Sequence, residues 1–132
     1  MLNLDVTTFS SVTDKAMSDA AAHPRWLAAI NRAVVECLSN PYMERDADHG
    51  GLLIGSPSGQ VYSSNGVCQC TAFEYGQPCW HRAAARLVRL HDEHIAAQRA
   101  RRAQELDEYE HYLEEQTARW AKAQAEMDEL YA

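Results

Sequence analysis

Apolar residues recur with a helical period in the segment that follows Pro24. They lie three or four positions apart, which places them on one face of a helix, and a proline suits the first helical turn. Asn40 and Pro41 follow this stripe and predict the end of the helix. The stripe consists of Trp26, Ile30, Ala33, Val34 and Cys37.

A hairpin is predicted after this helix. Two short β-prone runs, 52–54 and 60–63, flank a stretch of glycine, serine and proline at 55–59, which is typical of two strands joined by a tight loop. Asn65 and Gly66 form a second turn signal shortly before the first of two closely spaced cysteines.

Residues 1–23 carry a weaker signal. They are polar and rich in alanine, with little apolar periodicity. We expect a loose polar arm there, with room for one short helix.

The chain after Pro78 is predicted to be helical to its end. When residues 82–95 are placed about 100° apart, the apolar positions form one stripe and three arginines fall on the opposite side. The core stripe consists of Ala84, Leu87, Val88, His91 and Ile95, and the cationic face consists of Arg82, Arg86 and Arg89.

A second register begins at Leu106, where apolar spacings of three and four alternate. Such a heptad seam could pair with a second copy of the chain or fold back onto the first helix as core, and Gln116 is a polar seam position of the kind that can fix register. The seam consists of Leu106, Tyr109, Leu113, Gln116, Trp120, Ala123, Met127 and Leu130.

The length of the chain, 132 residues, bounds the core that it can bury. A folded part of about 90 residues is marginal by itself, and such domains often add a metal or disulfides. The first residues show no export signal, and no apolar stretch of about 18 residues occurs. We therefore expect a cytoplasmic protein, in which closely spaced cysteines bind metal more readily than they form disulfides.

The net charge of −7 is unevenly distributed. Residues 1–81 hold four basic and eight acidic side chains, residues 82–102 hold six arginines and two carboxylates, and residues 103–132 hold two basic side chains and nine carboxylates. Because phosphate attraction depends on charge, only the middle block is suited to nucleic acid.

Four residues have the spacing of a zinc site: Cys68-x-Cys70, eight intervening residues, then Cys79-x-His81. Zinc accepts thiolate and imidazole ligands in a tetrahedron, and this set fills all four positions. A filled shell leaves no place for a reactive water, so we expect a structural ion, one per chain, and no enzyme. Three thiolates bound to Zn²⁺ leave a local charge of −1. The helix N-terminus and Arg82 should help to stabilise this negative charge.

Two other candidate ligands are set aside. Cys37 lies in an apolar stripe and is expected to be a small buried hydrophobe. His49, beside Gly50 and Gly51, has no partner at ligand spacing and is expected to be a loop residue without a metal role.

The pairs Cys68-x-Cys70 and Cys79-x-His81 resemble the SWIM zinc finger, whose pattern is Cys-x-Cys, a variable loop and Cys-x-His. The resemblance covers about residues 52–95 and implies zinc binding by the four ligands, together with binding of DNA or of other proteins. The expected fold class is α+β, a zinc-stapled hairpin and helix with an N-terminal helix and a long C-terminal helix. The expected organisation is a loose arm at 1–23, a helix and loop at 24–51, the finger at 52–95 and an acidic helix, a candidate coiled coil, at 96–132.

Two functions remain open at this point. The first is a nucleic-acid-associated finger that contacts DNA through its arginines, with Phe73, Tyr75 or Trp80 as stacking or wedge groups. The second is a protein-interaction adaptor that recruits a partner or a second copy through residues 106–130. We expect neither a membrane nor a small-molecule substrate. The candidate phosphate contacts are Arg82, Arg86, Arg89, Arg99, Arg101 and Arg102.

Overall fold

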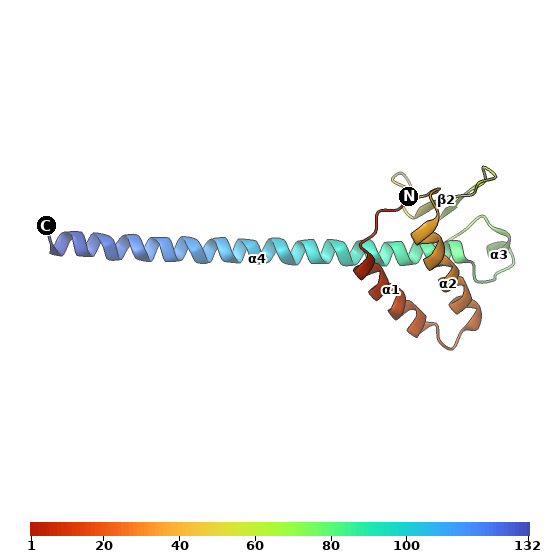
Figure 1. Ribbon diagram of the computed structural model, residues 1–132, viewed down its shortest axis with the longest axis horizontal. Coiled ribbons are helices and arrows are strands. Elements are labelled where there is room, and N and C mark those ends of the chain that lie inside the picture. The colour runs from red at the N-terminus through yellow and green to blue at the C-terminus, as the bar shows by residue number, and fades with distance from the viewer. The chain divides into compact units, whose positions relative to one another are not determined.

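The computed structural model describes residues 1–132 and divides into two units, Met1–Ile95 and Ala96–Ala132. It combines helices with one three-stranded antiparallel sheet, so the expected α+β class is confirmed (Figure 1). The elements are α1 (Val6–Asp19), α2 (Pro24–Ser39), β1 (Met43–Arg45), β2 (Leu52–Gly55), β3 (Val61–Ser64), α3 (Thr71–Glu74) and α4 (Trp80–Leu130).

Helix α1 corrects the expectation of a loose arm at residues 1–23. Asp5 caps the helix, because its carboxylate accepts hydrogen bonds from the Thr8 N–H at 3.0 Å and from the Thr8 hydroxyl at 2.6 Å. Phe9 and Val12 are buried on one face of the helix. The sequence pattern did not predict this face, because its other buried positions are threonine and alanine and not large aliphatic residues.

Helix α2 begins at Pro24 as predicted and ends at Ser39. Ile30, Ala33 and Cys37 of the predicted stripe are buried, and the remaining stripe members pack against the same core as partly buried side chains. The helical period therefore identified the buried face correctly.

The sheet has the order β1-β2-β3, with Leu53 opposite both Glu44 and Ser63. Both predicted strands are confirmed, and β1 was missed because three residues are too few to show an alternating pattern. Gly51 ends the preceding turn with φ +76°, and a Cβ atom there would lie 2.1 Å from the Ser64 carbonyl oxygen. The turn is thus held against the end of β3 at a distance that only glycine allows.

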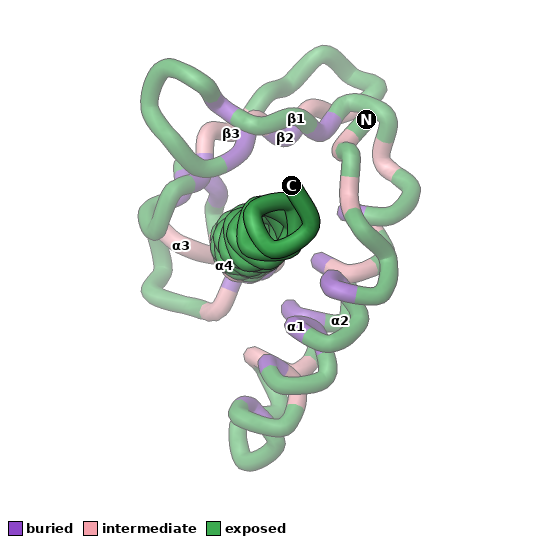
Figure 2. The backbone as a smooth tube through the Cα atoms, turned by 90° about the vertical axis from the view of Figure 1, so that its left-hand side faces the viewer, coloured by how far each residue is buried: buried purple, intermediate pink, exposed green.

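The core of the first unit is one cluster built from α1, α2, β1, β2 and the first turns of α4. Figure 2 shows the sheet and the α1–α2 pair on two sides of α4, with their buried segments in purple. On α4 the predicted stripe residues Ala84, Leu87 and Val88 are buried, and so are Ala83 and Ala85. The alanines allow the neighbouring elements to pack closely around this helix.

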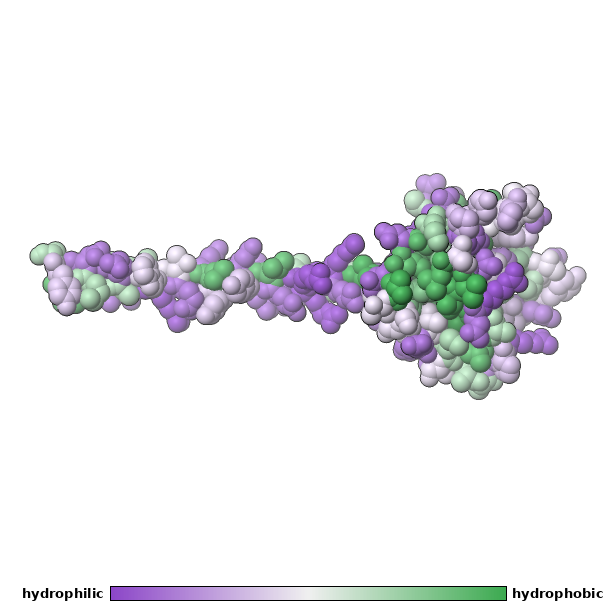
Figure 3. Space-filling view, viewed as in Figure 1, coloured by the Kyte–Doolittle hydropathy of each residue, from purple (hydrophilic) through white to green (hydrophobic).

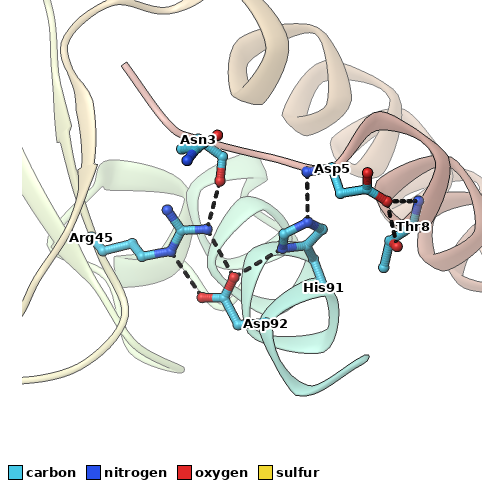
Figure 4. Close-up of polar contacts among 6 residues, drawn as sticks. All are labelled: Asn3, Asp5, Thr8, Arg45, His91 and Asp92. Atoms are coloured by element: carbon cyan, nitrogen blue, oxygen red, sulfur yellow. Dashed lines mark hydrogen bonds and ion pairs between the residues drawn. The ribbon is translucent and has the colours of Figure 1, made fainter. Parts of the chain in front are cut away.

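A polar network around His91 joins the chain start, β1 and α4 (Figure 4). The Asp5 N–H donates to His91 Nε2 at 3.0 Å, so His91 Nδ1 must carry the proton that it shares with Asp92 at 2.9 Å. Arg45 donates two hydrogen bonds to the Asp92 carboxylate, at 2.8 and 2.9 Å, and a third to the Asn3 carbonyl oxygen at 3.1 Å. His91 is therefore a hydrogen-bonded core residue, as its place in the core stripe predicted.

The second unit, Ala96–Ala132, is helical up to Leu130, and every residue in it is exposed. The predicted helix is confirmed. Its apolar seam side chains lie in solvent, and Figure 3 shows them at intervals along this segment. No helix of the chain is both long enough and apolar enough to cross a membrane.

Candidate metal centre

The first pair of predicted ligands, Cys68 and Cys70, is positioned by the hairpin. In the turn after β3, the Asn65 N–H donates to the Val67 carbonyl oxygen at 3.3 Å. Cys68 then forms an isolated antiparallel bridge with the last residue of β3, and Cys70 is extended with φ −82° and ψ 162°. Residues i and i+2 of an extended chain point to the same side, which lets both thiols reach one ion.

The second pair, Cys79 and His81, lies at the start of α4. Cys79 immediately precedes the first helical residue, and the Arg82 N–H donates to the Cys79 sulfur at 3.4 Å. Between the two pairs, α3 ends in a turn at Gly76, where φ is +68°. The positive end of α4 therefore lies at a sulfur atom, where it favours the thiolate.

The four ligand atoms all lie within 4.8 Å of one another. In a tetrahedral zinc site with Zn–S bonds of about 2.3 Å, neighbouring sulfur atoms are separated by about 3.8 Å, so a small contraction seats the ion. Cys68, Cys70 and Cys79 are buried, and none of them forms a disulfide. Three thiolates and one imidazole form a closed donor set that suits one structural zinc ion.

The three thiols differ in how readily they ionise before metal binds. Burial raises the pKa of Cys79 to about 12, and burial also raises the pKa of Cys68. Burial opposes ionisation of Cys70 as well, but its pKa is lowered because the backbone N–H groups of Phe73 and Ala72 and the two neighbouring thiols stabilise the thiolate. Cys70 therefore ionises more readily than the other two thiols, and zinc binding must displace the protons that the thiols still carry.

His81 is prepared to act as a neutral ligand. Its pKa is lowered by burial and then by the positive charge of Arg32, so the imidazole is neutral at pH 7. Its Nδ1 atom is buried with no hydrogen-bond partner in the protein. The rings of Trp80 and Tyr62 pack against it, with centroids 4.1 and 5.0 Å away. A bound metal would give this imidazole the polar partner that the protein does not supply.

Two of the three aromatic residues proposed for stacking belong to the metal centre instead. Phe73 packs against the cysteine cluster, and Trp80 packs against His81. Only Tyr75 is free, with 75% of its surface exposed. Packing around the metal therefore accounts for two of these aromatic side chains.

Arg82 differs from the two other arginines of the cationic face. Its guanidinium lies 5.0 Å from the ring centroid of Phe73 and 5.6 Å from that of Trp26, and its Nε atom is buried without an acceptor. The expectation that all three arginines lie opposite the core is therefore wrong for Arg82, which is half-buried. Arg86 and Arg89 are exposed as expected.

The three arginines line one cavity of about 620 Å³ within the first unit. Part of its lining comes from the α1–α2 segment and includes His23, Trp26 and Ile30, and another part comes from the turns at 49–51 and 65–66. Sequence reasoning missed this lining, because the segments are far apart in the chain and share no motif. His49, which was given no metal role, lies outside the metal cluster and lines this cavity.

The remaining candidates fall outside both sites. Cys37 is 1% exposed within the core, which confirms that it is a buried hydrophobe, and burial raises its pKa to about 12. Arg99, Arg101 and Arg102 are exposed residues of the second unit and do not line the cavity.

Comparison with known proteins agrees with the geometry of the metal centre. Residues 60–88 match the family model of the SWIM zinc finger, and this range holds β3, all four ligands, α3 and the first turns of α4. No curated protein and no solved structure matches the chain. The SWIM finger is a binding module and is not a known catalytic domain. Residues 60–88, with Cys68, Cys70, Cys79 and His81 placed around one metal position, therefore match the SWIM zinc finger in both sequence and ligand placement.

Proposed function

We propose that this SWIM finger binds nucleic acid, with Arg86 and Arg89 as the main phosphate contacts. The half-buried Arg82 lines the same cavity as these two arginines. The single observation that carries the proposal is the convergence of these three arginines on one cavity whose other walls come from α1, α2 and two turns. Arginine contacts with phosphate are the main source of affinity for nucleic acid.

The local charge supports this assignment although the whole chain is acidic. Asp19 is the only carboxylate that lines the cavity, and it pairs with Lys15 at 3.0 Å. Arg89 has one loose partner, Glu93 at 3.9 Å, and Arg86 has none. Two exposed guanidinium groups are thus available to an anion from solvent.

Zinc has a structural part in this proposal. His81 and Cys79 anchor the start of α4, and the arginines lie on the turns that follow directly. Four protein ligands leave no open coordination position, so the ion holds the arginine-bearing helix in place and does not itself contact nucleic acid.

The second candidate function is a protein-interaction adaptor. One observation favours it: the seam side chains of the second unit are exposed, including 59% of Leu106 and 73% of Trp120. Apolar side chains that repeat every 3.5 residues are buried when two such helices pair. We propose that residues 106–130 pair with a protein partner or with a second copy, whether or not the finger also binds nucleic acid.

The test is the affinity for labelled single-stranded and duplex DNA, measured by fluorescence anisotropy at several salt concentrations. Replacing Arg86 and Arg89 by glutamine should weaken binding to every sequence while zinc content and helicity stay unchanged. The slope of log affinity against log salt should fall by about 0.9 per lost contact on duplex and about 0.7 on single strands.

A matched control removes the same charge elsewhere. Arg119→Gln with Lys122→Gln changes the net charge equally in the second unit and should reduce the affinity less. If the wild-type protein binds no DNA or RNA even at low ionic strength, the nucleic-acid proposal fails and the adaptor becomes the leading function.

A further inference from the structure

We infer that the cavity beneath Arg86 and Arg89 is a subsite for one unpaired nucleotide, so the protein should prefer single-stranded nucleic acid to duplex. This inference rests on the proposed function and specifies its ligand. It follows from the volume and the lining of the cavity, which combine apolar and aromatic side chains with cationic groups.

The size and composition of the cavity suit a nucleotide. Its volume of about 620 Å³ falls in the range of about 300–1,000 Å³ that is usual for small-ligand sites. Trp26, Ile30 and Leu87 provide apolar and aromatic surface, and Arg86 and Arg89 provide positive charge. A nucleotide has the same two parts, a flat base and a charged phosphate.

Arg82 adds a planar group to the lining. Its guanidinium lies over the Trp26 ring, and unstacked bases in protein complexes commonly stack on aromatic rings or on guanidinium planes. The Arg82 Nε–H is a buried donor for which the protein provides no acceptor. A seated nucleotide would bring acceptors into the cavity that this side chain lines.

The part of the lining formed by residues 49–51 is held in place by its own contacts. Asp46 is buried, and its carboxylate accepts hydrogen bonds from the Asp48 and His49 N–H groups at 3.1 Å. His49 Nδ1 lies 3.4 Å from the same carboxylate. Since Gly51 is held against the end of β3, this turn is a fixed part of the cavity lining.

A cavity that accepts a base discriminates against duplex. A paired base is stacked on both faces and hydrogen-bonded at its edge, so it must be unstacked and unpaired before it can enter a pocket. An unpaired base avoids most of that free-energy cost. Exposed arginines on an open surface would contact the phosphates of either form, whereas a base-accepting cavity favours the single strand.

The experiment compares a labelled 12-mer with the duplex of the same sequence, at the same salt, by fluorescence anisotropy with the full chain. We expect the single strand to bind at least tenfold more tightly. Unlabelled mononucleotide should displace the labelled strand at concentrations at which inorganic phosphate does not. Repeating the measurement with DNA and RNA versions of the strand shows whether deoxyribonucleotides or ribonucleotides bind the subsite.

Variants locate the effect in the cavity. Trp26→Leu should abolish most of the single-strand preference, and Trp26→Phe, which keeps a ring, should retain it. Because Trp26 also packs against the core, His49→Ala serves as an exposed variant that leaves the core intact, with an expected loss of about threefold for the single strand only.

The outcomes separate this inference from the proposed function. Equal affinity for single strand and duplex, or displacement by phosphate as strong as displacement by mononucleotide, overturns the subsite while nucleic-acid binding stands. No binding to either form overturns both.

Discussion

Helical structure is stabilised by different interactions in the two units of the molecule, Met1–Ile95 and Ala96–Ala132. The first turns of α4 belong to the first unit and bury Leu87 and Val88 at 1% and 2% exposure, whereas no residue of the second unit is buried. In the second unit the helix shows only local contacts, such as the Gln104–Glu108 and Gln124–Asp128 side-chain hydrogen bonds.

This difference shows where each unit obtains its stability. Local pairs contribute a few tenths of a kcal/mol each, and helical segments in proteins are stabilised mainly by packing of an apolar face. The first unit provides that packing within one chain and adds a metal site. The second unit carries an apolar seam that no other segment of the chain covers.

Loss of the metal site should have the largest effect and should act on the first unit. Cys70→Ser or His81→Ala should unfold the finger, because structural zinc can supply about 10 kcal/mol or more of apparent binding free energy, more than a core of this size holds in reserve. Metal analysis should find about one zinc per chain in the wild type and none after treatment with a strong chelator. Protein purified without chelator that contains no zinc would contradict this.

Cys37→Ala is the control for the metal ligands. It should leave the zinc content unchanged because this thiol lies in the core, outside the metal cluster. In the folded protein, Cys37 should also resist alkylation, since burial raises its pKa to about 12.

A core substitution compared with a seam substitution sharpens the contrast between the units. Leu87→Ala should lower the free energy of unfolding by about 2–5 kcal/mol because it leaves a cavity in the core. Leu113→Ala, whose side chain is exposed, should cost less than about 0.5 kcal/mol in a monomer. Urea denaturation at several protein concentrations measures both. A cost for Leu113→Ala that grows with protein concentration would show that the seam is buried between copies.

The seam itself is tested by placing charge in it. Leu113→Lys together with Met127→Lys should convert any oligomer to a monomer and leave the zinc content unchanged, because the seam and the metal ligands lie in separate units. Light scattering and metal analysis on the same sample provide the two readouts. A wild-type monomer at all concentrations would exclude self-pairing and leave a different protein as the occupant of the seam.

A modest effect is expected at the Asp92 network of the first unit. The Arg45 hydrogen bonds hold the pKa of Asp92 below its ordinary value of 3.8, so its ionised form stabilises the fold above pH 3.8. That contribution is lost as the pH falls through the lowered folded-state pKa. Asp92→Asn should cost about 1 kcal/mol or less at pH 7, because the ion pair is partly exposed.

Urea unfolding curves of wild type and Asp92→Asn, recorded between pH 7 and pH 2.5, would test this sign. The difference between the two proteins should shrink as the pH falls. A difference that grows on acidification would contradict the assignment of Asp92 as the stabilising anion.

The correct and incorrect sequence predictions have separate causes. The α2 stripe, the β2–β3 hairpin and the buried face of α4 were predictable because each has a clear local period or turn signal. Helix α1 was not predictable because Thr8 and Thr13 occupy buried positions on it. Strand β1 was not predictable because it has only three residues. Their place in the fold depends on contacts with other segments.

The sequence by itself determined the metal ligands, because Cys68, Cys70, Cys79 and His81 are recognised by residue type and by short-range spacing, and zinc coordination depends on those two properties. Only the tertiary structure decided what the arginines face. Arg82 became half-buried beside the rings of Trp26 and Phe73, and Arg86 and Arg89 came to line a cavity, since α1, α2 and two turns fold against α4. Such a cavity is a property of segments brought together from residues 16–89, and no local pattern encodes it.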